Sequence, residues 1–120
     1  MMPHPSARRA AALIAELGLQ PHPEGGYYRE LYRSTQQVQP ADDRTARAAL
    51  TAISFLLTAG QHSRWHCLRS DEVWLFIEGD PLELFIVDAG LTRCQSHIIG
   101  PSDGTSAPQH IAPAGCWQAA

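Results

Sequence analysis

His66 and Glu72 are the two side chains of this sequence whose types and spacing best suit chemistry. A neutral imidazole offers one donor and one acceptor and titrates near neutral pH, and a carboxylate accepts hydrogen bonds or binds a metal ion. Gln118 adds an amide if the fold brings the end of the chain to them. The three side chains then either hold a divalent metal, weakly because an amide oxygen is a poor ligand, or orient a ligand without metal. In the second case Glu72 fixes the tautomer of His66; a core histidine without a function is the third interpretation.

Two basic residues, His62 and Arg64, precede His66 at every second position, so on a strand they would point to the same face as His66. At the mouth of a pocket, the guanidinium of Arg64 suits a phosphate or carboxylate, although a solvated rim charge is an equal alternative. His62 is a candidate general base because imidazole titrates near neutral pH. We therefore predict both residues as ligand-binding.

Strand alternation decides which other side chains join this set. We expect strands at 63–68 and 72–78, on which every second side chain points to the same face. If the two strands are neighbours in a barrel, its interior contains His66, Glu72, Trp74 and Phe76. A few polar groups among aromatic rings are typical of a small-molecule pocket, and Trp74 offers a stacking platform for a planar ligand.

The rest of the chain is predicted to be mostly β-structure. Apolar residues recur with helical spacing only over 6–18, where Ser6 is the expected N-cap and Gly18 the expected end. Short apolar segments separated by Gly, Pro, Asp and Ser then indicate strands, which argue for a sandwich or barrel. We place the strands at 27–34, 50–58, 63–68, 72–78, 82–88, 91–99, 110–112 and 116–120, and loops at 19–26, 36–47 and 100–108.

Composition narrows the class of protein. The 120 residues predict one domain, 1–120, and the net charge of −3 gives no electrostatic basis for binding nucleic acid. No apolar run is long enough for a membrane span or a signal peptide, so we expect no membrane partner and a cytoplasmic location. Three cysteines without C-x-x-C spacing predict buried thiols rather than a disulfide framework.

Several segments together resemble one protein family. The first is HPEGGYYRE at 22–30 with YRS at 32–34, followed by SRWH at 63–66, DEVW at 71–74, GDPLEL at 79–84 and PAGCWQA at 113–119. The spacing of Gly60, His66, Glu72 and Gly79 matches the first cupin motif, with Leu68 in place of its second histidine. The chain is thus similar to the cupin-five branch of the RmlC-like cupins, a domain of unknown function.

The resemblance implies an all-β double-stranded β-helix, the cupin jelly-roll barrel, with one short N-terminal helix. It also implies a homodimer with a cavity in each subunit, and a metal held by the motif residues, here His66, Glu72 and Gln118. The second cupin motif departs from its pattern because Gln118 stands where histidine is usual. Family members continue past this point, so we expect this domain to lack the last strands.

The segment 24–29 is the most family-specific part of the sequence. Its two glycines let backbone amides approach another surface closely. In a functional interpretation Glu24 and Tyr28 contact the ligand, and in a structural one the segment caps the barrel or builds the dimer interface. Both stay open.

These observations lead to one functional prediction with two alternatives. The protein binds a small polar metabolite, a sugar or nucleotide derivative, with His66 and Glu72 as the residues that would act in catalysis. The first alternative is an epimerase or isomerase acting on a sugar nucleotide, with or without metal. The second is a partner-binding remnant without activity.

Overall fold

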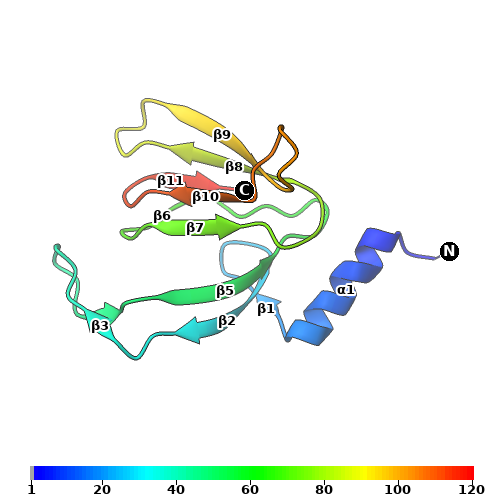
Figure 1. Cartoon of the computed structure of the whole chain (residues 1–120), viewed down its shortest axis with the longest axis horizontal. Coiled ribbons are helices and arrows are strands. Elements are labelled where there is room, and N and C mark those ends of the chain that lie inside the picture. The colour runs from blue at the N-terminus through cyan, green and yellow to red at the C-terminus, as the bar shows by residue number, and fades with distance from the viewer. Residues whose placement is uncertain (1) are drawn as a thin grey trace. The chain divides into compact units, whose positions relative to one another are not determined.

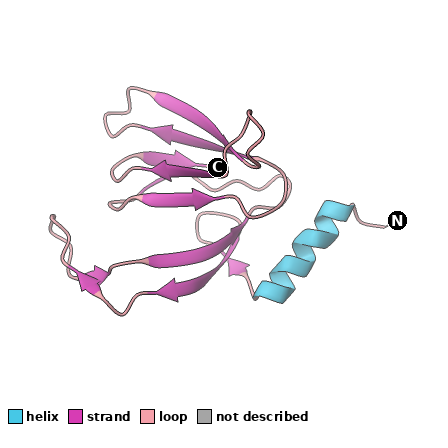
Figure 2. Ribbon diagram, in the orientation of Figure 1, coloured by secondary structure: helices cyan, strands magenta, loops and turns pink. Residues whose placement is uncertain are grey.

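One helix precedes a series of short strands in the computed structural model, which describes residues 2–120 (Figures 1 and 2). The strands pair antiparallel in four small sheets. The predicted class, mostly β with one N-terminal helix, is therefore confirmed. The chain forms two compact units, one that runs up to Gln61 and one that comprises His62–Ala120. No helix within residues 2–120 has the length and apolar character needed to cross a bilayer.

The helix, α1, spans Pro5–Leu17 and ends as predicted at Gly18, whose φ of 63° is left-handed. Its start differs from the prediction, since the N-cap is His4 and not Ser6. The Nδ1 atom of His4 accepts a hydrogen bond from the backbone N–H of Ser6 at 3.3 Å. The cap falls here because Pro5 occupies the first helical position, where a missing N–H costs nothing.

The first unit contains a three-stranded sheet in the order β1 (Gln20–Pro21), β2 (Tyr27–Arg33) and β5 (Thr51–Leu56). The prediction of a loop over 19–26 is partly wrong, because Gln20 and Pro21 pair with Tyr28 and Tyr27. Gly26, with a φ of 79°, makes the turn between them and packs against β5. A register shift between Glu30 and Tyr32 interrupts the pairing of β2 with β5.

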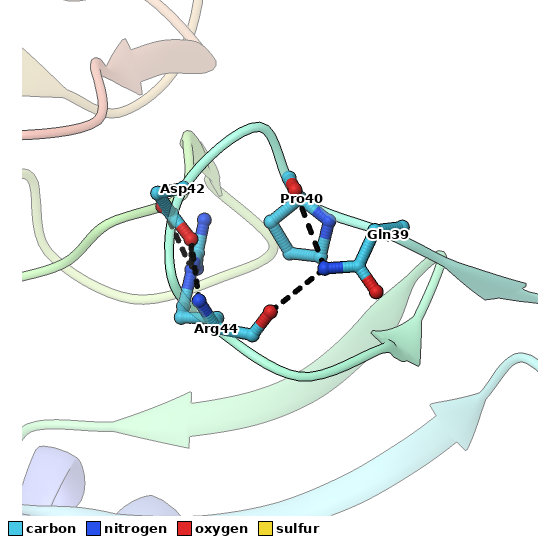
Figure 3. Close-up of polar contacts among 4 residues, drawn as sticks. All are labelled: Gln39, Pro40, Asp42 and Arg44. Atoms are coloured by element: carbon cyan, nitrogen blue, oxygen red, sulfur yellow. Dashed lines mark hydrogen bonds and ion pairs between the residues drawn. The ribbon is translucent and has the colours of Figure 1, made fainter.

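The predicted loop over 36–47 contains a small hairpin, β3 (Gln37–Val38) paired with β4 (Arg47–Ala48). Figure 3 shows how its own side chains close the turn. The amide of Gln39 donates to the carbonyl of Arg44 at 2.8 Å, and the Nε atom of Arg44 donates to both oxygens of Asp42 at 2.9 and 3.0 Å. These short-range bonds explain how a polar segment without a hydrophobic face keeps a defined path.

The second unit has two sheets. One has the order β6 (His66–Cys67), β11 (Trp117–Ala119), β8 (Leu82–Val87) and β9 (Cys94–Ile99), and the other pairs β10 (Gln109–Ala112) with β7 (Glu72–Leu75). Both contribute to one apolar core, which also receives Trp74, Phe76, Cys116 and Ala120. The core consists of Leu84, Ile86, Ile99 and Ala112.

Alternation along β7 follows the prediction. Trp74 and Phe76 pack against the core, whereas Val73 and Leu75 are 57% and 60% exposed.

The alternation predicted for the preceding strand is not found, because only His66–Cys67 of the predicted strand 63–68 is a strand. His66 is opposite Gln118, which would place residue 64 opposite Ala120, but the backbone of Ser63 bonds to Ala120 at 2.7 and 3.2 Å. The register thus slips by one residue, and Ser63, at 3% exposure, takes the inward position predicted for its neighbours.

We predict that the turn before β2 tolerates no side chain at Gly26. A Cβ there would lie 2.6 Å from the carbonyl oxygen of Leu56 and 2.9 Å from the Cδ2 atom of Leu57. Gly60 is the matched control, because its φ of 80° is nearly the same while nothing lies within 4 Å of its Cβ position. In urea unfolding, Gly60→Ala should cost about 1–2 kcal/mol from the left-handed backbone alone, and Gly26→Ala about 1–3 kcal/mol more from the clash. Equal costs for the two variants would contradict this.

Candidate functional site

A hydrogen bond joins the two sheets of the second unit at the centre of the predicted site. The indole Nε1–H of Trp74 on β7 donates to Oε1 of Gln118 on β11 at 2.9 Å. Gln118 is only 2% exposed and pairs with Ile86 of the core strand β8. Because an indole can only donate, the contact fixes which end of the amide faces Trp74. The amide nitrogen of Gln118 is left as a donor, and it makes no hydrogen bond within residues 2–120.

His66 lies beside Gln118, since the two are direct partners in the ladder between β6 and β11. Directly opposed residues project to the same face of a sheet, so the imidazole and the amide share one side. The Nδ1 atom of His66 lies 2.8 Å from the carbonyl oxygen of Arg64. A carbonyl only accepts, so Nδ1 carries a proton, and in the neutral ring Nε2 keeps its lone pair. The prediction that Glu72 fixes this tautomer is therefore wrong: the backbone of Arg64 does.

Glu72 begins β7, two residues before Trp74 and on the same face. Burial raises the pKa of its carboxyl above the usual 4.5, and the nearby charge of His66 opposes this with a smaller lowering. Ladder register places His66 beside Gln118, alternation places Glu72 on the face of Trp74, and the bond from Trp74 to Gln118 links the two strands. The structure thus brings together the side chains of His66, Glu72, Trp74 and Gln118.

The other predicted site residues lie elsewhere in the second unit or in the first. Phe76 packs against the apolar core, beyond Trp74. In the first unit the ring of Tyr28 meets that of His22 edge-on at 4.8 Å, and the backbone N–H of Glu24 donates to Nδ1 of His22 at 2.9 Å. These contacts give Glu24 and Tyr28 local structural partners. Their part in ligand binding stays a prediction.

His62 and Arg64 line a hollow of about 610 Å³ together with Trp65 and Phe85, and the four side chains of the candidate site are not part of its lining. The rings of Trp65 and Phe85 lie 6.4 Å apart. Phe85 alternates with the buried Leu84 and Ile86, so this hollow lies on the face of the sheet opposite to Gln118. The face that we predicted these two residues to share with His66 is not found, because of the register slip at Ser63. Their part in ligand binding stays a prediction.

Two histidines that the sequence analysis did not single out also face the interior of the second unit. His97 on β9 is paired with the buried Leu84, and His110 on β10 is paired with Trp74. Their rings are stacked, with centroids 3.7 Å apart. The alternation of inward and outward residues along the two strands could have indicated this placement. Each histidine stands two residues before a core residue, Ile99 for His97 and Ala112 for His110.

Comparison with known proteins identifies the family. The sequence model described as "Cupin superfamily (DUF985)" matches residues 11–120. The chain belongs to this family. The predicted resemblance to the cupin-five branch is thereby confirmed, and the cupin fold with it.

Two solved structures resemble this cupin closely. A hypothetical protein from Leishmania major shares 32% sequence identity at a TM-score of 0.86, and the match covers 92% of this chain and 68% of that one. Protein SO0799 from Shewanella oneidensis shares 32% identity at a TM-score of 0.81, with the same two coverages. No functionally curated protein matches the sequence. The comparisons therefore establish the fold and the family and leave the activity to the site.

The donor set of this cupin suits a divalent metal poorly. No group of three or more His, Cys, Asp or Glu side chains within the described part of the chain, residues 2–120, could hold a metal ion. The predicted set of His66, Glu72 and Gln118 supplies one nitrogen ligand, and its amide oxygen already accepts the indole N–H. Transition metals favour more nitrogen or thiolate ligands than this. We therefore expect the purified protein to retain no stoichiometric divalent metal at these residues, and analysis of its metal content checks this.

We predict that the bond between Trp74 and Gln118 behaves as a coupled pair. Trp74→Phe leaves the buried amide oxygen without its donor and should cost about 1–3 kcal/mol of unfolding free energy, in addition to the lost indole contacts. Adding Gln118→Leu removes the unpaired oxygen, so the double variant should be more stable than the sum of the single changes predicts. A double-mutant cycle by urea unfolding measures this coupling. Simple additivity would show that the contact contributes nothing.

We predict that Glu72→Gln stabilises the protein near neutral pH. A carboxyl whose pKa is raised on folding contributes its full stability below its unfolded pKa of 4.5 and loses it as pH rises through the higher folded value. The amide does not titrate, so the advantage of the variant should be absent at pH 4.5 and largest at pH 8. Urea unfolding across this range tests it, with Glu83→Gln, an exposed position on β8, as the control. An advantage that shrinks with rising pH would contradict the prediction.

Proposed function

We propose that this cupin domain binds a small, hydroxyl-rich metabolite, a sugar or nucleotide derivative, at the site formed by His66, Glu72, Trp74 and Gln118. The observation that carries the proposal is the partly buried carboxyl of Glu72. It makes no hydrogen bond or ion pair within residues 2–120, and burial raises its pKa. A partly buried carboxyl whose pKa is raised by burial is the kind of group that concentrates at sites that bind ligands.

The site offers what a sugar hydroxyl requires. The carboxylate of Glu72 and the Nε2 lone pair of His66 are acceptors, and the amide nitrogen of Gln118 is a donor. A hydroxyl group both donates and accepts, so adjacent hydroxyls of one ligand can satisfy all three. The indole of Trp74 supplies an aromatic surface beside these groups. Its own N–H is held by Gln118, which fixes the orientation of the ring.

One observation favours a second candidate, an epimerase or isomerase that needs no metal. The carbonyl of Arg64 holds the proton of His66 on Nδ1, so Nε2 is ready to accept a proton from a bound substrate. The carboxyl of Glu72, which burial inclines toward its neutral form, is a possible proton donor. Exchange of a substrate C–H for deuterium, lost in His66→Gln, distinguishes this enzyme from a binding domain.

A thermal-shift screen against monosaccharides, nucleotides and sugar nucleotides tests the binding proposal. A ligand present at 100 times its Kd stabilises the folded state by about 2.7 kcal/mol, which moves the Tm by several degrees. Glu72→Gln is the informative variant because it should be at least as stable as the natural protein and yet lose this ligand-induced shift.

Val73→Ala is the matched control, since this residue lies on the same strand and faces outward. It should keep the shift, and His66→Ala should lose it. A ligand that stabilises Glu72→Gln and His66→Ala as strongly as the natural protein would contradict the proposed site. No response across the whole screen would favour the alternative of a partner-binding remnant.

A further inference from the structure

The stacked histidines of the second unit form a feature that the proposed site does not use. His97 and His110 come from different sheets, and their rings lie 3.7 Å apart with planes inclined by 24°. Neither ring makes a hydrogen bond or an ion pair within residues 2–120. Two polar rings on inward faces, without protein partners, leave up to four ring nitrogens to an external group.

The pair borders a polar hollow of about 420 Å³. Its other wall is the loop between β9 and β10, which runs beside β9 through backbone bonds between Ala107 and Ile98 at 3.1 Å and between Gly100 and Ala107 at 3.0 Å. Ser96 and Gln109, the strand neighbours of the two histidines, also line it. The hollow is thus lined by strand and loop residues, several of them polar, together with the two imidazoles.

The stacked geometry excludes chelation of one metal ion by both rings. A metal bound by an imidazole lies in the ring plane about 2.0–2.1 Å from the nitrogen. Ring planes inclined by only 24° at a separation of 3.7 Å do not meet within that distance. What such a pair does provide is N–H donors at short spacing, and a positive charge when a ring takes up a proton.

The surroundings give this charge no counterion of their own. Burial lowers the pKa of His110 most, and the charge of His97 lowers it further, with no carboxylate among the causes. The acidic groups on the neighbouring elements are Glu72, on the strand paired with β10, Glu83, which is exposed on the opposite face of the strand paired with β9, and Asp103, in the loop. The carboxylate of Asp103 is engaged by the N–H and hydroxyl groups of Thr105 and Ser106. A bound anion would supply the missing counterion.

We propose that His97 and His110 form a binding site for a compact oxyanion, the phosphate or carboxylate group of a small molecule, and that the site takes up protons as the anion binds. The anion offsets the repulsion between two protonated rings 3.7 Å apart, which is otherwise unfavourable in a partly buried place. Because anion binding and proton uptake are coupled, protonation of the rings also strengthens anion binding, so the anion binds more tightly as pH falls.

Nuclear magnetic resonance titration of the six histidine rings tests the proposal on the whole chain. Sulfate, which keeps its charge between pH 5.5 and 7.5, is the probe for phosphate-like groups, acetate is the probe for carboxylates, and chloride at equal ionic strength is the reference. We expect sulfate or acetate to raise the pKa values of His97 and His110 selectively, and to bind about tenfold more tightly at pH 5.5 than at pH 7.5. The stronger of the two probes identifies the class of group.

His97→Gln and His110→Gln should each abolish the effect on the remaining ring, while His4→Gln, at the start of α1, should leave it unchanged. Circular dichroism establishes that each variant is folded. The proposal is overturned if chloride shifts the two rings as much as sulfate and acetate do, if all histidines respond alike, or if binding is unchanged in a folded variant of either ring.

Discussion

The hydrogen bond from Trp74 to Gln118 is the constraint on which the candidate site depends. It connects strands that belong to different sheets and are 44 residues apart in the sequence. By occupying the amide oxygen it turns the amide nitrogen into the free donor of the site, and it holds the indole in one orientation. His66 is placed next to this bond by strand register, and Glu72 by its position two residues before Trp74. Without the bond, the indole of Trp74 and the amide of Gln118 would lose their fixed orientation beside His66 and Glu72.

The polar groups of the second unit are of two kinds, those with a hydrogen-bond partner within the protein and those without one. Gln118, Trp74 and Asp103 have partners within the protein, and these contacts fix positions. Glu72, His97 and His110 have ionisable groups that are partly buried and lack hydrogen-bond partners among residues 2–120. Groups of the first kind hold the fold in place. Groups of the second kind are the ones through which the proposed ligands would bind.

The sequence predicted what depends on local patterns. The end of α1 at Gly18 and the inward face of β7 follow from helix spacing and strand alternation. His62 and Arg64 do not share the face of His66 for one reason, a slip of one residue in the pairing of Ser63 with Ala120. No local pattern encodes that slip, because it depends on a partner strand more than 50 residues away, yet it reverses the face of every side chain before it. The stacked histidines were missed for a related reason, since their contact joins two sheets.

Alternation along β7 and β8 distinguishes the strand that builds the site from the strand that builds the core. On β8 the buried residues are Leu84 and Ile86 and the charged Glu83 faces outward, the usual pattern for a sheet with one solvated face. On β7 the pattern is reversed, because Glu72 faces inward and the apolar Val73 and Leu75 are exposed. The packing of Trp74 against the core, the ladder to β10 and the bond to Gln118 together hold this strand in position. The strand therefore presents a carboxyl of the candidate site on the same face as a side chain that packs against the core.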